Sequence, residues 1–283
     1  MPSLRDIRRR INSVKNTQKI TRAMKMVAAA RLRRAQEAIL RARPYAYHMR
    51  DLVNRVALRA GAQTHPLLRG GSADKVALIV VTSDRGLCGG FNSALVNETM
   101  RILNEDLQGR QVELTVVGRK GLDSLRRRPC TIKTHHTNVM EESPLRAAVR
   151  LIDEQVAEFM KGETDEVYCL YNEFKSAISQ RLAFERILPF EPPPRGEIVI
   201  DYVYEPSQEA VLSGLLARHL QVQMLRILYE SAASEHGARM TAMDSATNNA
   251  GDVIDRLTLL FNRARQTAIT KEVIEIVSGA EAL

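Results

Sequence analysis

The stretch that decides the fold lies at residues 3–43 and reads SLRDIRRRINSVKNTQKITRAMKMVAAARLRRAQEAILRAR. It contains neither glycine nor proline, the two residues that most often interrupt a helix. Ser3 and Asp6 have the spacing of an N-terminal capping box. Spacings of three and four, typical of a coiled-coil seam, separate the first apolar residues: Leu4, Ile7, Ile11 and Val14. We therefore predict one long helix beginning near Ser3, and we expect Pro44 to kink or restart it.

The same seam becomes polar further along the helix and then resumes. Gln18 and Thr21 are the polar positions, and the predicted apolar seam continues with Met24, Val27, Ala28, Leu32 and Ala35. The three-residue step from Thr21 to Met24 breaks the strict heptad, which predicts local overwinding of the helix pair.

The C-terminal region has a matching seam. No proline follows Pro206, and two sets of residues recur every seven positions: Met243, Ala250, Leu257 and Ala264, and Thr247, Ile254, Phe261 and Ala268. At about 1.5 Å per residue this helix would be roughly 100 Å long, far longer than a compact domain of this size. We therefore predict that helices at 1–60 and 207–283 pair as a long antiparallel coiled coil, a shaft. Upstream leucines predict burial against a third element: Leu212, Leu215, Leu216, Leu220, Leu225 and Leu228.

Between the two helices, residues 61–206 have the composition of a small α/β domain. Buried-strand patterns at 75–82, 112–117 and 166–174 alternate with helical patterns at 93–107 and 144–160. A last strand is expected at 198–204. This order predicts a Rossmann-like α/β domain inserted in the coiled coil.

Positive charge is concentrated at the N-terminus. Residues 1–50 contain 14 Lys or Arg residues against only Asp6 and Glu37, which gives a net charge of +12. The whole chain carries +8, so the remaining residues together carry −4. A local charge of this size requires an acidic partner. Nucleic acid, anionic lipid and acidic protein loops all meet that requirement, and composition does not choose among them.

No catalytic, cofactor-binding or metal-binding set of residues can be identified in the sequence. The glycine-rich loop at 86–90 follows a predicted strand but matches neither the dinucleotide nor the Walker phosphate-binding pattern. Cys88 could be a reactive thiol at a helix N-terminus, although no His or Asn marks it as a nucleophile. The three cysteines are too scattered for a zinc site or a disulfide framework. His219 and His236 are expected to be partly exposed on the long helix. No apolar run is long enough to span a bilayer.

Two other classes of protein remain as alternatives. A basic coiled-coil nucleic-acid-binding protein would explain the charge, but no aromatic residues interleave with the basic ones to stack on bases. A small nucleotide-binding enzyme would explain the α/β unit, but it would require a phosphate-binding motif.

Four motifs together resemble the gamma subunit family of the F-type ATP synthase, whose members form the rotor shaft. They are INSVKNTQKITRAMKMVAAARLRRAQ at 11–36, SDRGLCGGFN at 83–92, RMTAMDSATNNA at 239–250 and ITKEVIEIVSGAEA at 269–282. The resemblance extends over essentially the whole chain. The redox-regulatory cysteine insertion of chloroplast members and a transit peptide are both lacking, which favours the bacterial form.

This resemblance implies a non-catalytic subunit of a proton-transporting complex, without a cofactor. The implied partners are the alpha and beta subunits of a hexamer, the epsilon subunit and the membrane c-ring, and nucleic acid is not among them. The implied location is peripheral, on the cytoplasmic face of the bacterial cell membrane. The residues implied to contact the beta subunits are Arg8, Arg9, Met24, Arg239, Arg265, Gln266 and Thr270. A partner contact or a turn is implied for Asp84, Arg85, Gly86 and Cys88.

Overall fold

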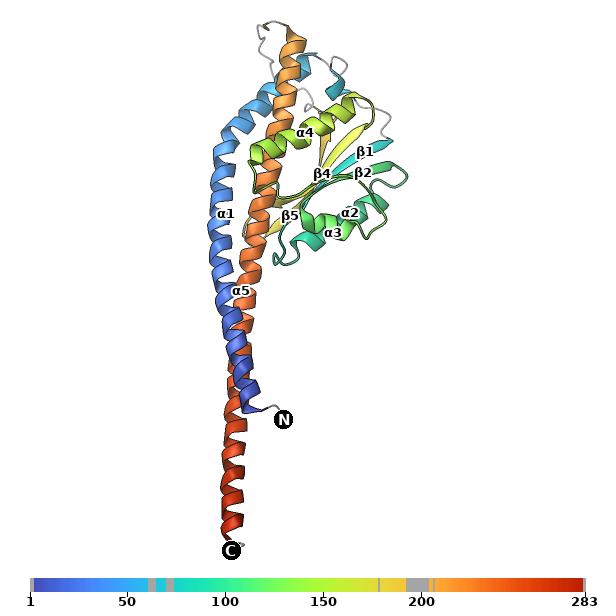
Figure 1. Cartoon of the computed structure of the whole chain (residues 1–283). Coiled ribbons are helices and arrows are strands. Elements are labelled where there is room, and N and C mark those ends of the chain that lie inside the picture. Colours follow the sequence, from blue (N-terminus) through green and yellow to red (C-terminus); the bar gives the residue numbers. More distant parts are fainter. Residues whose placement is uncertain are drawn as a thin grey trace. The chain divides into compact units, whose positions relative to one another are not determined.

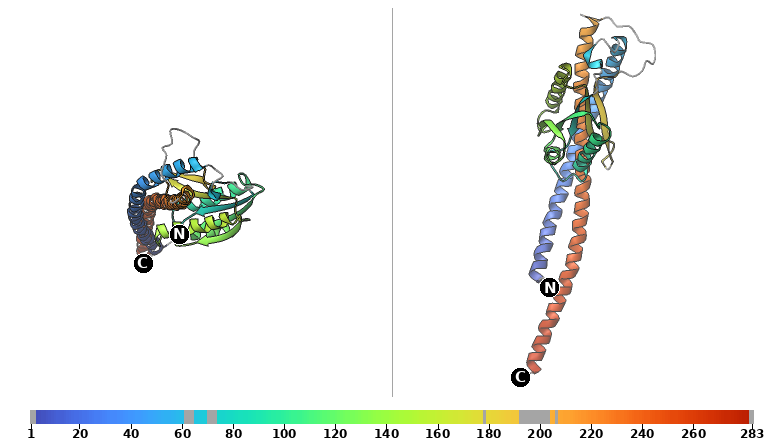
Figure 2. Two further views of the ribbon diagram at one scale, coloured as in Figure 1. Left: turned by 90° about the horizontal axis from the view of Figure 1, so that it is seen from above. Right: turned by 90° about the vertical axis from the view of Figure 1, so that its right-hand side faces the viewer.

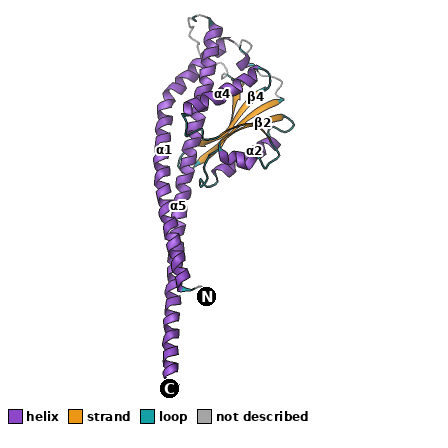
Figure 3. Ribbon diagram, in the orientation of Figure 1, coloured by secondary structure: helices purple, strands orange, loops and turns teal. Residues whose placement is uncertain are grey.

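The structure is a computed structural model that describes residues 3–60, 65–69, 74–177, 179–191, 204–205 and 207–281. Figures 1 and 3 show two long helices and a sheet covered by shorter helices. In chain order the elements are α1 (Leu4–Ala60), the short 3-10 helix η1 (Pro66–Leu68), β1 (Lys75–Val81), α2 (Phe91–Asn104), β2 (Gln111–Val117), α3 (Arg119–Leu125), β3 (Thr131–His136), α4 (Pro144–Met160), β4 (Glu166–Phe174), β5 (Gln180–Leu188) and α5 (Gln208–Glu281).

The chain divides into two compact units. The coil unit consists of Met1–Ala28 and Met240–Leu283, and the α/β unit consists of Ala29–Arg239. Each long helix thus contributes residues to both units. The predicted limit at residue 60 is the end of α1 and the limit at 207 is one residue before the start of α5, and neither is a limit of these units.

In the coil unit the two helices run antiparallel, as predicted. The Lys25 side chain meets Asp244 across the pair, and Arg8, earlier on α1, lies over the ring of Phe261, later on α5. Figure 2 shows the N-terminal part of α1 alongside α5. The predicted capping box is confirmed, because the Asp6 N–H donates to Ser3 Oγ at 3.2 Å and the Ser3 N–H donates to Asp6 Oδ2 at 3.3 Å.

The seam between the helices follows the predicted heptads on α5 but differs from the prediction at two positions on α1, Lys25 and Val27. All eight predicted α5 positions are buried or half-buried. On α1 the heptad continues from Thr21 through Lys25 to Ala28, so the predicted break at Met24 is not needed. Val27 was wrongly placed in the seam, because it is 54% exposed. A lysine at a seam position was missed because its charge concealed the periodicity.

The sheet of the α/β unit has the strand order β3-β2-β1-β4-β5. Its first four strands are parallel, and β5 pairs antiparallel with β4. The predicted Rossmann-like arrangement is therefore present in this unit. Sequence analysis missed α3, β3 and β5, which are short or rich in charged and polar residues. Residues 198–203 of the predicted last strand lie outside the described residues.

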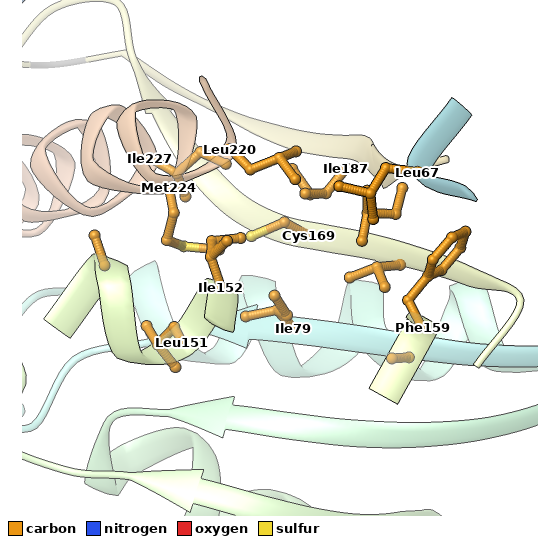
Figure 4. Packing of buried hydrophobic residues seen from close by; sticks show 14 of the residues in the cluster. Leu67, Ile79, Leu151, Ile152, Phe159, Cys169, Ile187, Leu220, Met224 and Ile227 are labelled. Carbon is orange, nitrogen blue, oxygen red and sulfur yellow. The ribbon is translucent and has the colours of Figure 1, made fainter. Parts of the chain in front are cut away.

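Both faces of the sheet are buried, and β1 shows this most simply. Ala77, Ile79 and Val81 belong to a core formed with α4, α5 and the end of α1, part of which Figure 4 shows. The alternate residues of β1 belong to a second core with α2 and α3. A continuous apolar run is expected of a strand that is covered on both faces. Four of the six upstream leucines of α5 are buried and the other two are partly buried in the first core, which confirms the third element.

Helix α1 does not stop at Pro44. The residue lies inside the helix, so the predicted restart is wrong. Figure 1 shows α1 bending in its light-blue stretch, as expected when a proline removes a backbone hydrogen bond and crowds the preceding turn.

Candidate partner-contact sites

The structure distributes the predicted site residues over the two units. The coil unit contains Arg8, Arg9, Met24, Arg265, Gln266 and Thr270, and the α/β unit contains Asp84, Arg85, Gly86, Cys88 and Arg239.

In the coil unit, the predicted residues near the start of α1 face solvent. Arg8 and Arg9 are both exposed. The Arg8 guanidinium lies 5.4 Å from the centre of the Phe261 ring, a cation–π geometry that covers one end of the seam. Arg9 is thus the more accessible of the two for a partner, while Arg8 also contributes to helix pairing.

The predicted residues near the end of α5 are also exposed. Arg265, Gln266 and Thr270 have exposed side chains. The Thr270 hydroxyl donates to the carbonyl oxygen of Gln266 at 2.9 Å, so Gln266 and Thr270 lie one turn apart on one face, as their spacing predicted. Thr267 makes the same kind of bond to the Arg263 carbonyl at 3.0 Å. Thr258, earlier on α5, makes this bond to the Ile254 carbonyl at 2.8 Å.

Met24 is half-buried next to a polar layer that crosses the coil. Its neighbour Lys25 donates to Asp244 Oδ1 at 2.6 Å. The hydroxyls of Thr21 and Thr247 are 2.8 Å apart, and Gln18 Nε2 donates to the Thr247 carbonyl at 3.4 Å. Polar groups at seam positions fix the register of a helix pair, because any slip leaves them without partners.

In the α/β unit, the other predicted residues lie on the loop between β1 and α2, which is held by side-chain hydrogen bonds. The Ser83 N–H donates to Asn92 Oδ1 at 3.0 Å, and Ser83 Oγ donates to the Arg85 carbonyl at 2.7 Å. The side chain of Asp84 accepts from the Arg119 N–H at 3.0 Å. Arg85 forms an ion pair with Glu141 at 2.6 Å. The predicted turn at these residues is therefore an ordered loop joined to α2 and α3.

Arg239 holds the same loop from α5. Its guanidinium donates to the carbonyl oxygen of Arg85 at 3.1 Å and to that of Gly86 at 3.2 Å. It also forms an ion pair with Glu235 at 2.6 Å, one helical turn earlier. The family resemblance implied a contact between Arg239 and the beta subunits, but within the chain Arg239 is only 8% exposed. The guanidinium charge is therefore buried. Hydrogen bonds to the loop carbonyl oxygens and the ion pair with Glu235 compensate for its removal from water.

Cys88 does not have the environment of a nucleophile. The side chain is buried, and burial raises the pKa of its thiol, partly offset by a hydrogen bond with Ser83 and by the charge of Arg239. The Asn92 amide donates to its sulfur at 3.3 Å. A thiol with a raised pKa carries little thiolate at neutral pH, so the side chain is structural.

The crevice at the carboxyl ends of β1 and β4 is where open α/β sheets bind ligands, because the strand order reverses there. Here α5 occupies part of it. Ser234 Oγ donates to the Asn172 carbonyl at 3.0 Å, and Gly237 lies against Ala177, so that an added Cβ would be 3.2 Å from the carbonyl oxygen. Together with Arg239, these contacts place the backbone of α5 where a ligand would lie.

The N-terminus of α3 is also closed to an anion, since its N–H groups already have acceptors. The Lys120 N–H donates to the Ser83 carbonyl, and the Gly121 N–H donates to Thr82 Oγ1, both at 3.0 Å. A phosphate at this end of the sheet would have to displace those acceptors.

Two cavities flank α5 within the α/β unit. One of about 500 Å³ lies beside the loop and is lined by Arg31, Arg34, Arg85, Glu141 and His236 among others. The other, of about 850 Å³, is lined by Tyr45, Phe190, Arg226 and His219 among others. Among the described residues no three His, Cys, Asp or Glu side chains are grouped to bind a metal. None of the described helices is apolar over a length that would cross a bilayer.

Burial lowers the pKa of both α5 histidines; the expected partial exposure holds for His236 but not for His219. His219 is buried, and burial together with the charges of Arg50 and Arg226 lowers its pKa to about 4. His236 is half-buried, and burial with Arg239 and Arg31 lowers its pKa to about 4 as well. Both imidazoles are neutral at pH 7.

An ionic cluster on α5 was missed by sequence analysis. Arg226 donates to Glu185 at 2.7 Å and to Glu230 and the Tyr171 hydroxyl at 3.1 Å, which joins α5 to β4 and β5. The signal was present as Arg and Glu four residues apart on a helix otherwise rich in apolar residues. The same spacing occurs at Glu235 and Arg239.

Comparison with known proteins places this arrangement in a family. A family model described as ATP synthase matches residues 3–283. The chain is 51% identical to the ATP synthase gamma chain of Anaeromyxobacter sp. (strain Fw109-5) and 47% identical to that of Pelotomaculum thermopropionicum, with both chains of each pair fully covered.

Solved structures agree. A chain of the Tetrahymena thermophila mitochondrial ATP synthase central stalk and c-ring is 26% identical, with a TM-score of 0.61 over 80% of this chain and 99% of that one. A chain of the Euglena gracilis mitochondrial ATP synthase, in rotational state 3, shares the fold with a TM-score of 0.73 at 20% identity, over 99% of this chain and 94% of that one. The chain therefore belongs to the ATP synthase gamma chain family.

Proposed function

We propose that the chain is the central rotor stalk of an F-type ATP synthase, where it couples ion flow through a membrane ring to ATP synthesis or hydrolysis in a hexamer of alpha and beta subunits. Membership of the gamma chain family and the likeness to the central stalk support this proposal. In this function the chain has no catalytic site of its own.

One observation carries the proposal most directly. The end of α5 exposes apolar side chains, including Ile269, Val273, Ile274 and Ile276. A row of exposed apolar residues of this kind requires a partner that covers it. Exposed basic residues of α1 require an acidic partner as well. A collar of subunits around the coil would meet both requirements.

The coil has two unlike helices and no three-fold symmetry. It presents a different face to each of three equivalent sites, and so it stabilises a different conformation in each. Rotation exchanges these preferences, and nucleotide occupancy in turn affects rotation, because coupling between two binding equilibria is reciprocal. The basic residues steer and align the coil against acidic loops of the beta subunits.

The specific contacts are part of the proposal. Exposed residues of the coil unit, together with the half-buried Met24, are assigned to the beta subunits: Arg8, Arg9, Met24, Arg265, Gln266 and Thr270. The other proposed partners are the epsilon subunit and the c-ring, which would hold the chain peripherally on the cytoplasmic face of the bacterial membrane. Nucleic-acid binding is not proposed, because the family accounts for the basic helix.

The proposal is tested by reconstitution. Alpha and beta subunits of a bacterial relative, combined with this chain, should form a complex whose ATP hydrolysis depends on the chain, whereas the chain alone should hydrolyse no ATP. Hydrolysis at an enzyme-like rate by the purified chain would refute it.

A matched pair of variants tests the contacts at the end of α5. Gln266→Ala with Thr270→Ala should lower steady-state turnover of the complex while leaving the stability of the free chain within roughly 0.5 kcal/mol, the usual range for surface substitutions. Thr258→Ala is the control, because its hydroxyl makes the same backbone bond, to the Ile254 carbonyl, about two turns before Gln266. Equal turnover in all of these complexes would remove the assignment.

Met24→Lys tests the middle of the coil. It adds a cation beside Lys25, so it should create attractive contacts with acidic loops in some rotary positions and hinder rotation there. We expect fewer protons pumped per ATP hydrolysed, with normal assembly. An unchanged pumping ratio would mean that Met24 is an ordinary seam residue.

A further inference from the structure

The larger cavity of the α/β unit, of about 850 Å³, is lined by residues of α1, the end of β5 and α5. Its volume is within the range of about 300–1,000 Å³ that is typical of small-molecule sites. The proposed function does not use it. Buried apolar residues line it from both helices and from the end of β5: Ile39, Ile187, Pro189 and Val222. The cavity therefore has an apolar interior.

The opening of this cavity is basic. Arg43 and Arg50 of α1 and Arg218 of α5 line the cavity and are exposed. None of these three arginines forms an ion pair with another described residue. The Arg50 guanidinium lies over the ring of Tyr47, and Arg218 donates to the Tyr45 hydroxyl at 3.4 Å. Three unpaired positive charges thus lie where the cavity meets solvent.

The acidic residues of the cavity do not cancel this charge, because each already has a cation as its partner. The pairs are Glu173–Lys175, Glu185–Arg226, Glu230–Arg226 and Glu191–Arg186. In all, six Lys or Arg and four Glu side chains line the cavity, which gives a net charge of +2. The charge complements an anionic ligand.

His219 adds an unused hydrogen-bonding group to the cavity wall. It is only 7% exposed, and neither of its ring nitrogens has a hydrogen-bond partner among the described residues. Burial, and after it the charges of Arg50 and Arg226, lowers its pKa, so the imidazole is neutral and has one N–H to donate at pH 7. Phe190 packs against it, with the ring centres 5.1 Å apart. A buried polar group without a partner costs free energy, which a bound acceptor would recover.

We propose that this cavity binds an amphipathic organic acid, whose carboxylate accepts hydrogen bonds from Arg50 and His219 and whose apolar chain lies against the buried residues of α1 and α5. An apolar interior alone would accept any hydrocarbon, whereas guanidinium groups select a carboxylate, which they bind through paired N–H groups. Arg43 and Arg218 complete the positive opening. The inference does not depend on the proposed function, because every lining residue belongs to the α/β unit of this chain.

Decanoate is the probe that tests the site, added to the full-length chain labelled with carbon-13 in its histidine rings. We expect the nuclear magnetic resonance signal of the His219 ring to shift and to saturate at one decanoate per chain. The signal of His135 should stay in place, because this exposed residue lies on β3, at the opposite edge of the sheet from β5. An unmoved His219 signal would overturn the inference.

Two matched ligands separate the two parts of the recognition. Decanol has the apolar chain without the charge, and acetate has the carboxylate without the chain. Each should bind at least about tenfold more weakly than decanoate, because each lacks one of the two contributions. Equal binding of decanol would refute the recognition of an acid, and equal binding of acetate would refute the use of the apolar interior.

A matched pair of double variants tests the basic opening. Arg43→Gln with Arg50→Gln removes two of its cations and should weaken decanoate binding about tenfold or more. Arg33→Gln with Arg41→Gln is the control, because it changes the charge of the same helix equally at two exposed residues that do not line the cavity. The control should bind decanoate as the wild type does. Equal weakening in both double variants would mean a general effect of charge and would overturn the site.

Ala46→Phe tests the cavity itself by filling it. Ala46 is half-buried on α1 and lines the cavity, so a phenyl ring there should occupy the space of the ligand and abolish the His219 shift. Helix content and an unchanged His135 signal show that the variant is folded. A folded Ala46→Phe chain that binds decanoate like the wild type would overturn the assignment to this cavity. If the variant does not fold, the arginine variants decide the question alone.

Discussion

In the coil unit two helices meet along a narrow seam where threonine, glutamine and lysine alternate with apolar residues, whereas the sheet of the α/β unit lies between two layers of side chains excluded from water. Only a few coil residues, such as Ile7 and Ala28, are fully buried. The α/β unit can therefore stabilise itself, while the coil has exposed apolar residues left for a partner. The same helices take part in both, so burial and not helix propensity distinguishes the units.

The two units should differ most in how much stability the chain loses when a leucine is truncated to alanine. Leu170 in β4 is completely buried, and Leu170→Ala should lower the free energy of unfolding by about 3–5 kcal/mol, since it loses burial and leaves a cavity. Leu259 in the coil unit is exposed, and Leu259→Ala should change it by no more than roughly 0.5 kcal/mol. Urea denaturation of the full chain measures both. Similar losses would remove the distinction between the units.

Acid should destabilise the α/β unit selectively. All six histidines lie outside the coil unit. Because the folded pKa of His219 is about 4, below the value of 6.5 for an unperturbed histidine, the unfolded chain binds more protons between these pH values. Stability contributed by the neutral imidazole is present above pH 6.5 and falls as the pH drops towards 4, by at most about 3 kcal/mol.

Glu230 and Glu235 act in the opposite direction, because burial raises their pKa. The difference between the wild type and His219→Asn therefore isolates the histidine. Hydrogen exchange at pH 7 and pH 5 should show faster opening in the α/β unit of the wild type and a weaker pH dependence in the variant. An equal acceleration of the coil amides in the wild type would contradict this assignment.

Replacing a glycine by alanine should lower the free energy of unfolding in the α/β unit but raise it in the coil unit. At Gly121 a Cβ would lie 2.4 Å from Thr82 Oγ1, so Gly121→Ala should cost about 2 kcal/mol through overpacking. At Gly251, inside α5 of the coil unit, the nearest atom is the flexible Gln18 Nε2 at 3.4 Å. Gly251→Ala should stabilise the helix by about 1 kcal/mol. Calorimetry and helix content by circular dichroism measure the two effects, and a loss of stability with Gly251→Ala would show tighter packing in the coil.

The smallest effect is expected for the ion pair in the coil. The Lys25 and Asp244 side chains are both more than 40% exposed, so their interaction should be worth about 0.5 kcal/mol or less and should weaken in salt. A double-mutant cycle with Lys25→Met and Asp244→Asn measures it. A coupling energy above roughly 1.5 kcal/mol, unaffected by salt, would mean that the seam excludes water as the α/β core does.

The elements that the sequence predicted correctly are those whose pattern depends on burial alone. The heptads of α5 and the apolar run of β1 are of this kind. Strand β5 was missed because its charged residues Glu185 and Arg186 find partners only in the folded chain. The heptad position of Lys25 was obscured for the same reason. A charge that is neutralised by a residue far away in the sequence conceals periodicity.

The candidate contact sites were predicted unevenly. Arg9, Arg265 and Gln266, which the family resemblance implied as partner contacts, are exposed and so accessible to a partner. The burial of Arg239 was not predicted, because its acceptors are backbone carbonyl oxygens on a loop more than 150 residues earlier. The positive φ of Leu87, 62°, has no sequence signature either, since neither the leucine nor its neighbours Gly86 and Cys88 indicate it.

The part of α5 that occupies the crevice of the sheet acts as a ligand belonging to the same chain. A tethered ligand has a fixed effective concentration, so it cannot be diluted or titrated away. A free metabolite would stabilise a folded protein by an amount that grows with its concentration, but this helix contributes a constant amount. The stabilisation that α5 gives to the sheet is therefore the same at every concentration of any free ligand in solution.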